Sequence, residues 1–130
     1  MERIEGFIPY EQALELKDLG FDEPCLGMYR KKNRMYLLQE PKRVNSEKES
    51  VISAPLFQEV FKWFRETHKL ESFVYYDDSY GFYGCKFYGN DERDNIHGQF
   101  KNFETHPEAE LVCVKELIKF VKKNSDGKES

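Results

Sequence analysis

The sequence predicts an α+β fold in which three helices pack on an antiparallel sheet built from two β-hairpins. Three stretches place apolar side chains at helical spacing between start and stop signals, and two others carry aromatic and β-branched residues around a polar turn. The chain has 130 residues, of which 39% are hydrophobic and 15% aromatic, which suits one domain with a packed core. Disordered chains are poor in aromatic residues, so the composition argues against disorder.

The first helix is predicted between Pro9 and Gly20. Proline is tolerated in the first turn of a helix, where a backbone N–H would have no partner within the helix. Apolar side chains follow at three- and four-residue spacing, at Tyr10, Ala13, Leu14, Leu16 and Leu19. Gly20 is expected to cap the helix in the left-handed conformation, with Phe21 folding back on the last turn.

The first hairpin is predicted over residues 25–39. Its arms run from Leu26 to Tyr29 and from Met35 to Leu38, and the basic residues between them form its turn. Residues 41–50 are charged and poor in apolar side chains, so we expect a mobile loop there.

The second helix is predicted to begin at Ser53 as its N-cap, with Pro55 in its first turn. One face then collects apolar and aromatic side chains at helical spacing: Leu56, Phe57, Val60, Phe61, Phe64 and His68. A face so dense in aromatic rings is expected to be buried against the sheet.

The second hairpin is predicted over residues 72–88, with a turn around Asp77 and Ser79. Aromatic and β-branched residues dominate both arms, as strands prefer. Residues 89–98 are polar and without periodicity, so we expect a loop. Phe100 and Phe103 suggest either a short further strand or a plug.

The third helix is predicted to begin at Thr105, with Pro107 in its first turn and Glu108 completing a capping box. Its apolar face ends near residue 121, and residues 125–130 are expected to be a disordered polar tail. The predicted organisation is therefore a single α+β domain over residues 1–124.

The charge, hydropathy and cysteine content of the sequence predict the cellular compartment and exclude some classes of protein. The chain carries 20 basic and 24 acidic residues, a formal charge of -4, and its pI is about 5.5, so non-specific nucleic-acid binding is not expected. A mean hydropathy of -0.77 and the lack of a long apolar run argue against a membrane span. The N-terminus lacks the pattern of a secretory signal, and the three cysteines form no CxxC pair. These features predict a reducing, cytoplasmic location.

No catalytic or metal-binding constellation emerges from the spacing of residues. His68, His97 and His106 are far apart and share no ligand spacing. Cys85 and Cys113 lie in apolar segments and are interpreted as buried small hydrophobes. We therefore expect no metal and no cofactor, and an enzyme is the least supported class.

The candidate binding residues come from the two hairpins. The second hairpin supplies Tyr75, Tyr80, Tyr83 and Tyr88, and the turn of the first supplies Arg30, Lys31, Lys32 and Arg34. Residues 80–87 share Gly81, Phe82 and Phe87 with the aromatic strand on which RNA-recognition sheets stack bases, but lack its leading basic residue. The tyrosines are therefore either core residues with some exposed members, or a stacking platform, or a protein interface. The basic turn is either a solvated hairpin tip or a site for an anion.

Three blocks of the sequence stand out together: YEQALELKDLGFDEPC over residues 10–25, APLFQEVFKWFRE over 54–66 and PEAELVCVKELI over 107–118. They are similar to a family of small uncharacterised proteins from phages and prophages of Bacteroidota. The resemblance spans most of the chain. It implies a phage or mobile-element origin and a cytoplasmic setting in an infected bacterium, and it carries no catalytic or binding residue over to this sequence.

Together these observations predict a non-catalytic phage accessory protein that acts by binding a host or phage protein. The alternative is a counter-defence protein that sequesters a nucleotide-like small molecule, with a base on the tyrosines and a phosphate on the basic turn, in a pocket where the two hairpins meet. Nucleic-acid binding is less favoured because of the acidic pI. A homodimer formed through a hairpin arm at a sheet edge stays open.

Overall fold

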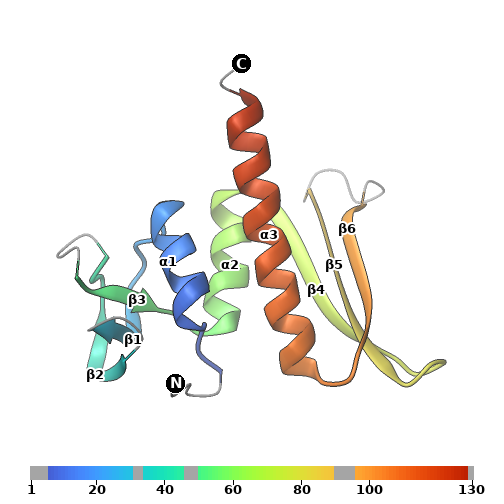
Figure 1. Cartoon of the computed structure of the whole chain (residues 1–130), viewed down its shortest axis with the longest axis horizontal. Coiled ribbons are helices and arrows are strands. Elements are labelled where there is room, and N and C mark those ends of the chain that lie inside the picture. Colours follow the sequence, from blue (N-terminus) through green and yellow to red (C-terminus); the bar gives the residue numbers. More distant parts are fainter. Residues whose placement is uncertain (1–5, 31–33, 46–49, 90–95, 129–130) are drawn as a thin grey trace. The chain divides into compact units, whose positions relative to one another are not determined.

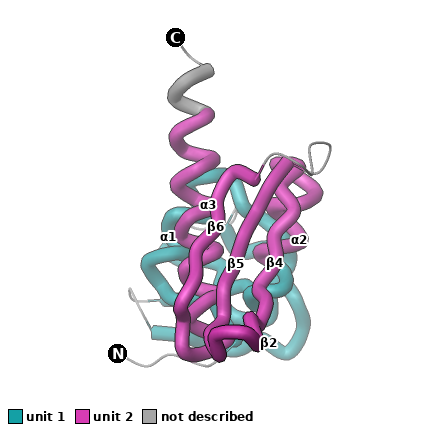
Figure 2. The backbone as a smooth tube through the Cα atoms, turned by 90° about the vertical axis from the view of Figure 1, so that its right-hand side faces the viewer, with its two compact units in different colours: residues 1–59 teal, residues 60–130 magenta. Residues whose placement is uncertain are grey.

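The computed structural model of the chain describes residues 6–30, 34–45, 50–89 and 96–128, with side chains up to residue 124. Over these residues it contains three helices and two three-stranded antiparallel sheets, which confirms the α+β class. The chain divides into two compact units, residues 1–59 and 60–130 (Figures 1 and 2). Each unit is described by itself.

The first unit combines one helix with the first sheet. Helix α1 (Tyr10–Asp18) precedes strands β1 (Cys25–Arg30), β2 (Arg34–Lys42) and β3 (Ile52–Ala54). The strand order is β2-β1-β3, with Met28 paired to Tyr36 on one side and to Ser53 on the other. The first hairpin is thus confirmed, and it is completed by a third strand.

The end of α1 is capped as the sequence predicts. Gly20 adopts a φ of +99°, and its N–H donates to the Lys17 carbonyl at 3.0 Å. The Phe21 N–H donates to the Leu16 carbonyl at 2.9 Å, which completes a Schellman motif. Phe21 and Leu16 are both about 1% exposed, so the cap also anchors the helix in the core of this unit.

The start of the second helix differs from the prediction. Ser53 is not its N-cap: it lies in β3, and its N–H donates to the Asn45 side-chain oxygen at 2.7 Å. Helix α2 runs from Phe57 to Thr67, and Glu59 caps it by accepting the Leu56 N–H at 2.8 Å. The β-branched Ile52 and the pairing of this segment with β1 outweigh the capping preference of serine.

The second unit is built on the second hairpin. Strands β4 (Leu70–Asp77), β5 (Phe82–Gly89) and β6 (Ile96–Phe103) are antiparallel in the order β4-β5-β6. Helix α3 (His106–Lys128) lies along one face of this sheet (Figure 1). The Thr105 hydroxyl accepts the Glu108 N–H at 3.2 Å, so the predicted N-cap is confirmed.

The start of β6 and the end of α3 differ from the boundaries that the sequence predicts. Residues 96–98 are not a loop: they begin β6, an eight-residue strand and not a short addition around Phe100. Strand β6 alternates too weakly in hydrophobicity to be recognised, because Gly98 and Asn102 stand two residues on either side of Phe100, where alternation requires apolar side chains. Helix α3 continues to Lys128, into the segment expected to be a disordered tail. Residues 41–42, expected to belong to a mobile loop, are the end of β2. Residues 46–49 of that expected loop, residues 90–95 of the second one and residues 129–130 lie outside the described residues.

The sequence predicts one sheet built from both hairpins, but the structure contains no such shared sheet over the described residues. Each hairpin forms its own three-stranded sheet, because β3 pairs with β1 and β6 pairs with β5. The boundary between the two units lies within the continuous helix α2, between residues 59 and 60. The single domain over residues 1–124 stays a prediction. None of the helices, over the part of the chain that the structure describes, combines the length and apolar character needed to cross a bilayer.

Candidate ligand-binding site

The second sheet has one face covered by α3 and one face open. Side chains of paired residues in adjacent strands share a face, so β4 and β5 sort their residues between the two. The α3 face holds Ser72, Val74, Cys85 and Phe87, and the Phe87 ring contacts Phe120 of the helix. The open face holds Phe73, Tyr75, Asp77, Phe82 and Lys86, joined by Gln99 and Lys101 from β6. Figure 2 looks toward this open side of the sheet.

A shallow hollow of about 430 Å³ lies on the open face. All three strands of the sheet contribute to its lining: Phe73, Val74, Tyr75, Asp77, Lys86, Gln99 and Lys101. Phe73 is 44% exposed, which leaves a large apolar surface in contact with solvent. An exposed aromatic surface beside charged groups is typical of an interaction site.

Tyr75 is held from two sides within this hollow. A Cβ atom at Gly84 would lie 2.7 Å from the Tyr75 ring, so only glycine lets the ring rest on the β5 backbone. The Gln99 side-chain amide donates a hydrogen bond to the Tyr75 hydroxyl at 3.0 Å. The ring is therefore oriented by its neighbours before any ligand arrives.

Lys86 brings a positive charge to the same place. Its Nζ lies 5.8 Å from the centre of the Phe73 ring and 5.9 Å from that of Tyr75. Both distances fall within the range of a cation–π interaction. The ammonium group is thus positioned beside two aromatic rings and at the wall of the hollow.

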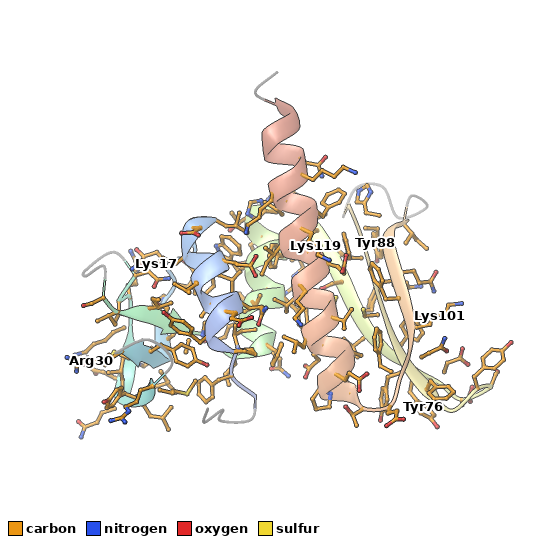
Figure 3. The ribbon with its side chains drawn as sticks, in the orientation of Figure 1. Lys17, Arg30, Tyr76, Tyr88, Lys101 and Lys119 are labelled. Carbon is orange, nitrogen blue, oxygen red and sulfur yellow. The ribbon has the colours of Figure 1, made fainter. Side chains whose placement is uncertain are left out.

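A second hollow of about 240 Å³ adjoins the first and shares Tyr75, Asp77 and Lys101 with it. Tyr80 and Phe82 extend it toward the β4–β5 turn. The turn is ordered by Asp77, whose side chain accepts the Ser79 N–H at 3.0 Å and whose carbonyl accepts the Gly81 N–H at 2.8 Å. Lys101 extends from β6 on the side away from α3 (Figure 3).

The structure separates the four predicted tyrosines. Tyr75 and Tyr80 line the hollows, and Tyr80 is 76% exposed. Tyr83 also lines the second hollow, but its ring packs edge-on against His106 of α3. Tyr88 is 8% exposed and its ring contacts that of Phe73, so it packs against a residue of the site and does not present a free ring.

Arg30 and Arg34, two of the predicted basic residues, do not lie on the sheet that carries the tyrosines. Arg30 and Arg34 pair with each other at the end of the first hairpin, in the other unit. The Arg30 guanidinium lies 5.8 Å from the centre of the Tyr36 ring. Lys31 and Lys32 lie outside the described residues. The two groups that we expected to act together therefore belong to different sheets.

Lys86, Lys101, Gln99 and Asp77 supply polar groups of the lining, and none of them was predicted from the sequence as a binding residue. Strand alternation could have identified Lys86. It lies between the buried Cys85 and Phe87, so its side chain belongs to the opposite face of the strand. Lys101 and Gln99 gave no such signal, because their segment was not recognised as a strand over its full length.

The three cysteines are buried and form no disulfide, as the sequence analysis expected for Cys85 and Cys113 as buried small side chains. Burial, followed by the charges of Glu59 and Glu23, raises the pKa of the Cys25 thiol to about 12. The side-chain hydrogen bond between Cys85 and Cys113 lowers the pKa of Cys85 and raises that of Cys113. Among the described residues, no group of His, Cys, Asp and Glu side chains is placed to hold a metal ion.

Comparison of the chain with protein-family models, with curated proteins and with solved structures finds no match.

Proposed function

We propose that this protein acts by binding, and that the open face of β4-β5-β6 takes a nucleotide or a nucleotide-like ligand. The observation that carries the proposal is the position of Lys86 beside the rings of Phe73 and Tyr75, at the wall of the 430 Å³ hollow. An aromatic ring stacks on a base, and a lysine beside it pairs with phosphate.

The remaining polar groups suit the same ligand. Gln99 and Asp77 offer hydrogen-bonding groups at the edges of the hollow, where base edges or ribose hydroxyls are recognised. Lys86 and Lys101 outnumber Asp77 among the charged side chains of the lining, so the local charge favours an anion although the whole chain is acidic.

A calorimetric titration with the four ribonucleoside monophosphates tests this function. We expect at least one of them to bind, and Lys86→Met to weaken that binding about tenfold, since a charge-assisted contact is worth about 1.5–3 kcal/mol. Tyr75→Leu should weaken it by a similar factor because the stacking surface is lost.

Lys115→Met is the matched control, since Lys115 is exposed on α3 and the change in net charge is the same. It should leave the affinity unchanged. If none of the four nucleotides binds the wild-type protein, or if both lysine variants weaken binding equally, the open face is not a nucleotide site.

A protein partner, as the sequence analysis favoured, has support at a different place. Strand β2 is an edge of the first sheet, and Leu37 on it is 59% exposed. An edge strand with unpaired backbone groups and apolar side chains is suited to pairing with another chain. A phage accessory role in the cytoplasm of an infected cell fits either kind of partner and remains a proposal.

A further inference from the structure

We infer that the site takes two linked nucleotides, one in each hollow, rather than a single one. This inference rests on the proposed function, because it extends the nucleotide site of the first hollow to the second. It identifies the ligand as two nucleotides joined by phosphate, a chemistry found in single-stranded RNA or DNA and in free dinucleotides.

The two hollows share lining residues and differ in their aromatic surfaces. They share Tyr75, Asp77 and Lys101, so a ligand that fills both passes these residues. Phe73 is found only in the first hollow, and Tyr80 only in the second. Each hollow therefore has an aromatic ring of its own beside the shared Tyr75, as stacking of two bases requires.

Each hollow has at least one lysine in its lining. Lys86 lines only the first hollow, whereas Lys101, on β6, lines both. A phosphate that joins the two nucleotides would lie at the shared boundary, where Lys101 is the cation of the lining. Asp77 is partly engaged by the Ser79 N–H, and its second oxygen is suited to accept from a ribose hydroxyl or a base amine.

Tyr80 is the residue to substitute, because truncating its exposed side chain does not remove a core contact. It is 76% exposed in the β4–β5 turn, and it lines only the second hollow. Tyr76 is the matched control: it is 56% exposed, lies on the neighbouring strand end, and packs against Tyr83 on the opposite face of the sheet.

The experiment compares adenosine monophosphate with the linear dinucleotide pApA by calorimetry, using the full chain. We expect pApA to bind at least about tenfold more tightly than the monophosphate. Tyr80→Ala should reduce pApA affinity to the level of the monophosphate and leave monophosphate binding unchanged, while Tyr76→Ala should preserve the tenfold gain. Lys101→Met should likewise remove most of the gain.

If pApA binds no more tightly than the monophosphate, or if Tyr80→Ala leaves the gain intact, the two-nucleotide inference is overturned and the single-nucleotide site stands. If neither compound binds, and none of the other three ribonucleoside monophosphates binds either, the proposed function itself fails. Two further probes separate the sources of the ligand. Tighter binding of a longer oligoadenylate, after correction for its number of registers, points to a strand, and tighter binding of cyclic di-adenosine monophosphate points to a free dinucleotide.

Discussion

Single residues in this protein show how position in a strand decides the role of a side chain. Tyr75 and Tyr83 are both tyrosines of the second hairpin, yet one lies over Gly84 on the open face and the other packs against His106 of α3. The difference follows from alternation, since successive side chains of a strand point to opposite faces. For these two tyrosines, position in the strand therefore decides which face the ring lies on, and the chemistry of the side chain does not.

At the residue scale, we expect the raised pKa of the Cys25 thiol to lower the stability of the folded protein at high pH. The folded protein keeps the thiol protonated to about pH 12, while the unfolded chain loses the proton near the ordinary value of 9.0. Below pH 9 both states are protonated, so the contribution is constant. Between pH 9 and 12 the unfolded state is favoured by up to about 1.4 kcal/mol per pH unit.

Urea unfolding at pH 8 and pH 10 under reducing conditions measures this effect. The wild-type free energy of unfolding should fall by about 1 kcal/mol more than that of Cys25→Ser, which does not titrate in this range. The serine variant also preserves a donor for the Glu23 carbonyl, which the Cys25 thiol contacts at 3.3 Å. An equal loss in both proteins would show that the pKa of Cys25 is not raised by folding.

At the scale of elements, the ends of the helices are set by local contacts. Helix α3 begins where the Thr105 hydroxyl accepts a backbone N–H, and α1 ends in the Schellman motif at Gly20. Each of these contacts spans only a few residues of chain. Such signals are readable in a sequence because both partners lie within one or two helical turns.

We expect the Gly20 cap of α1 to contribute measurably to the stability of the protein. Gly20→Ala should destabilise the protein by about 1 kcal/mol, because the left-handed φ of +99° is unfavourable for a residue with a Cβ atom. The added methyl group meets nothing within 4 Å, so steric collision does not contribute. Thermal or urea unfolding measures the loss. Gly20→Asn should cost less, since asparagine tolerates this conformation, and equal stability of the alanine variant and wild type would refute the explanation.

At the scale of the whole molecule, the exposed edge of the first sheet predicts self-association. Strand β2 lies at the edge of β2-β1-β3 and exposes Leu37. Antiparallel pairing of two β2 strands centred on Leu37 would set Arg34 of each copy opposite Glu40 of the other, which joins opposite charges twice. We expect a concentration-dependent dimer.

Sedimentation velocity from micromolar to submillimolar concentration tests this prediction. Leu37→Lys should remain monomeric, because a charge on an edge strand opposes strand pairing. Leu26→Lys serves as a control for an exposed leucine on the central strand β1, and it should still dimerise. A wild-type protein that stays monomeric at every concentration would leave β2 to a different partner.

The sequence by itself determined those features that depend on neighbours along the chain. These are the α+β class, the two hairpins, the Gly20 cap of α1 and the Thr105 cap of α3. Each depends on residues close in sequence, whose spacing and conformational preferences are visible without a structure. Tyr75 and Tyr80 line the hollows, and their role as binding residues stays a prediction.

Only the tertiary structure decided what depends on residues far apart in the chain. Pairing of residues 52–54 with β1 turned an expected helix cap into a strand, and the β5–β6 pairing placed Gln99 and Lys101 beside Tyr75. It also assigned Arg30 and Tyr75 to different sheets. Strand partners are chosen by long-range contacts rather than by local preference, so neither the separation of the two sheets nor the lysines of the candidate site could be predicted from sequence spacing.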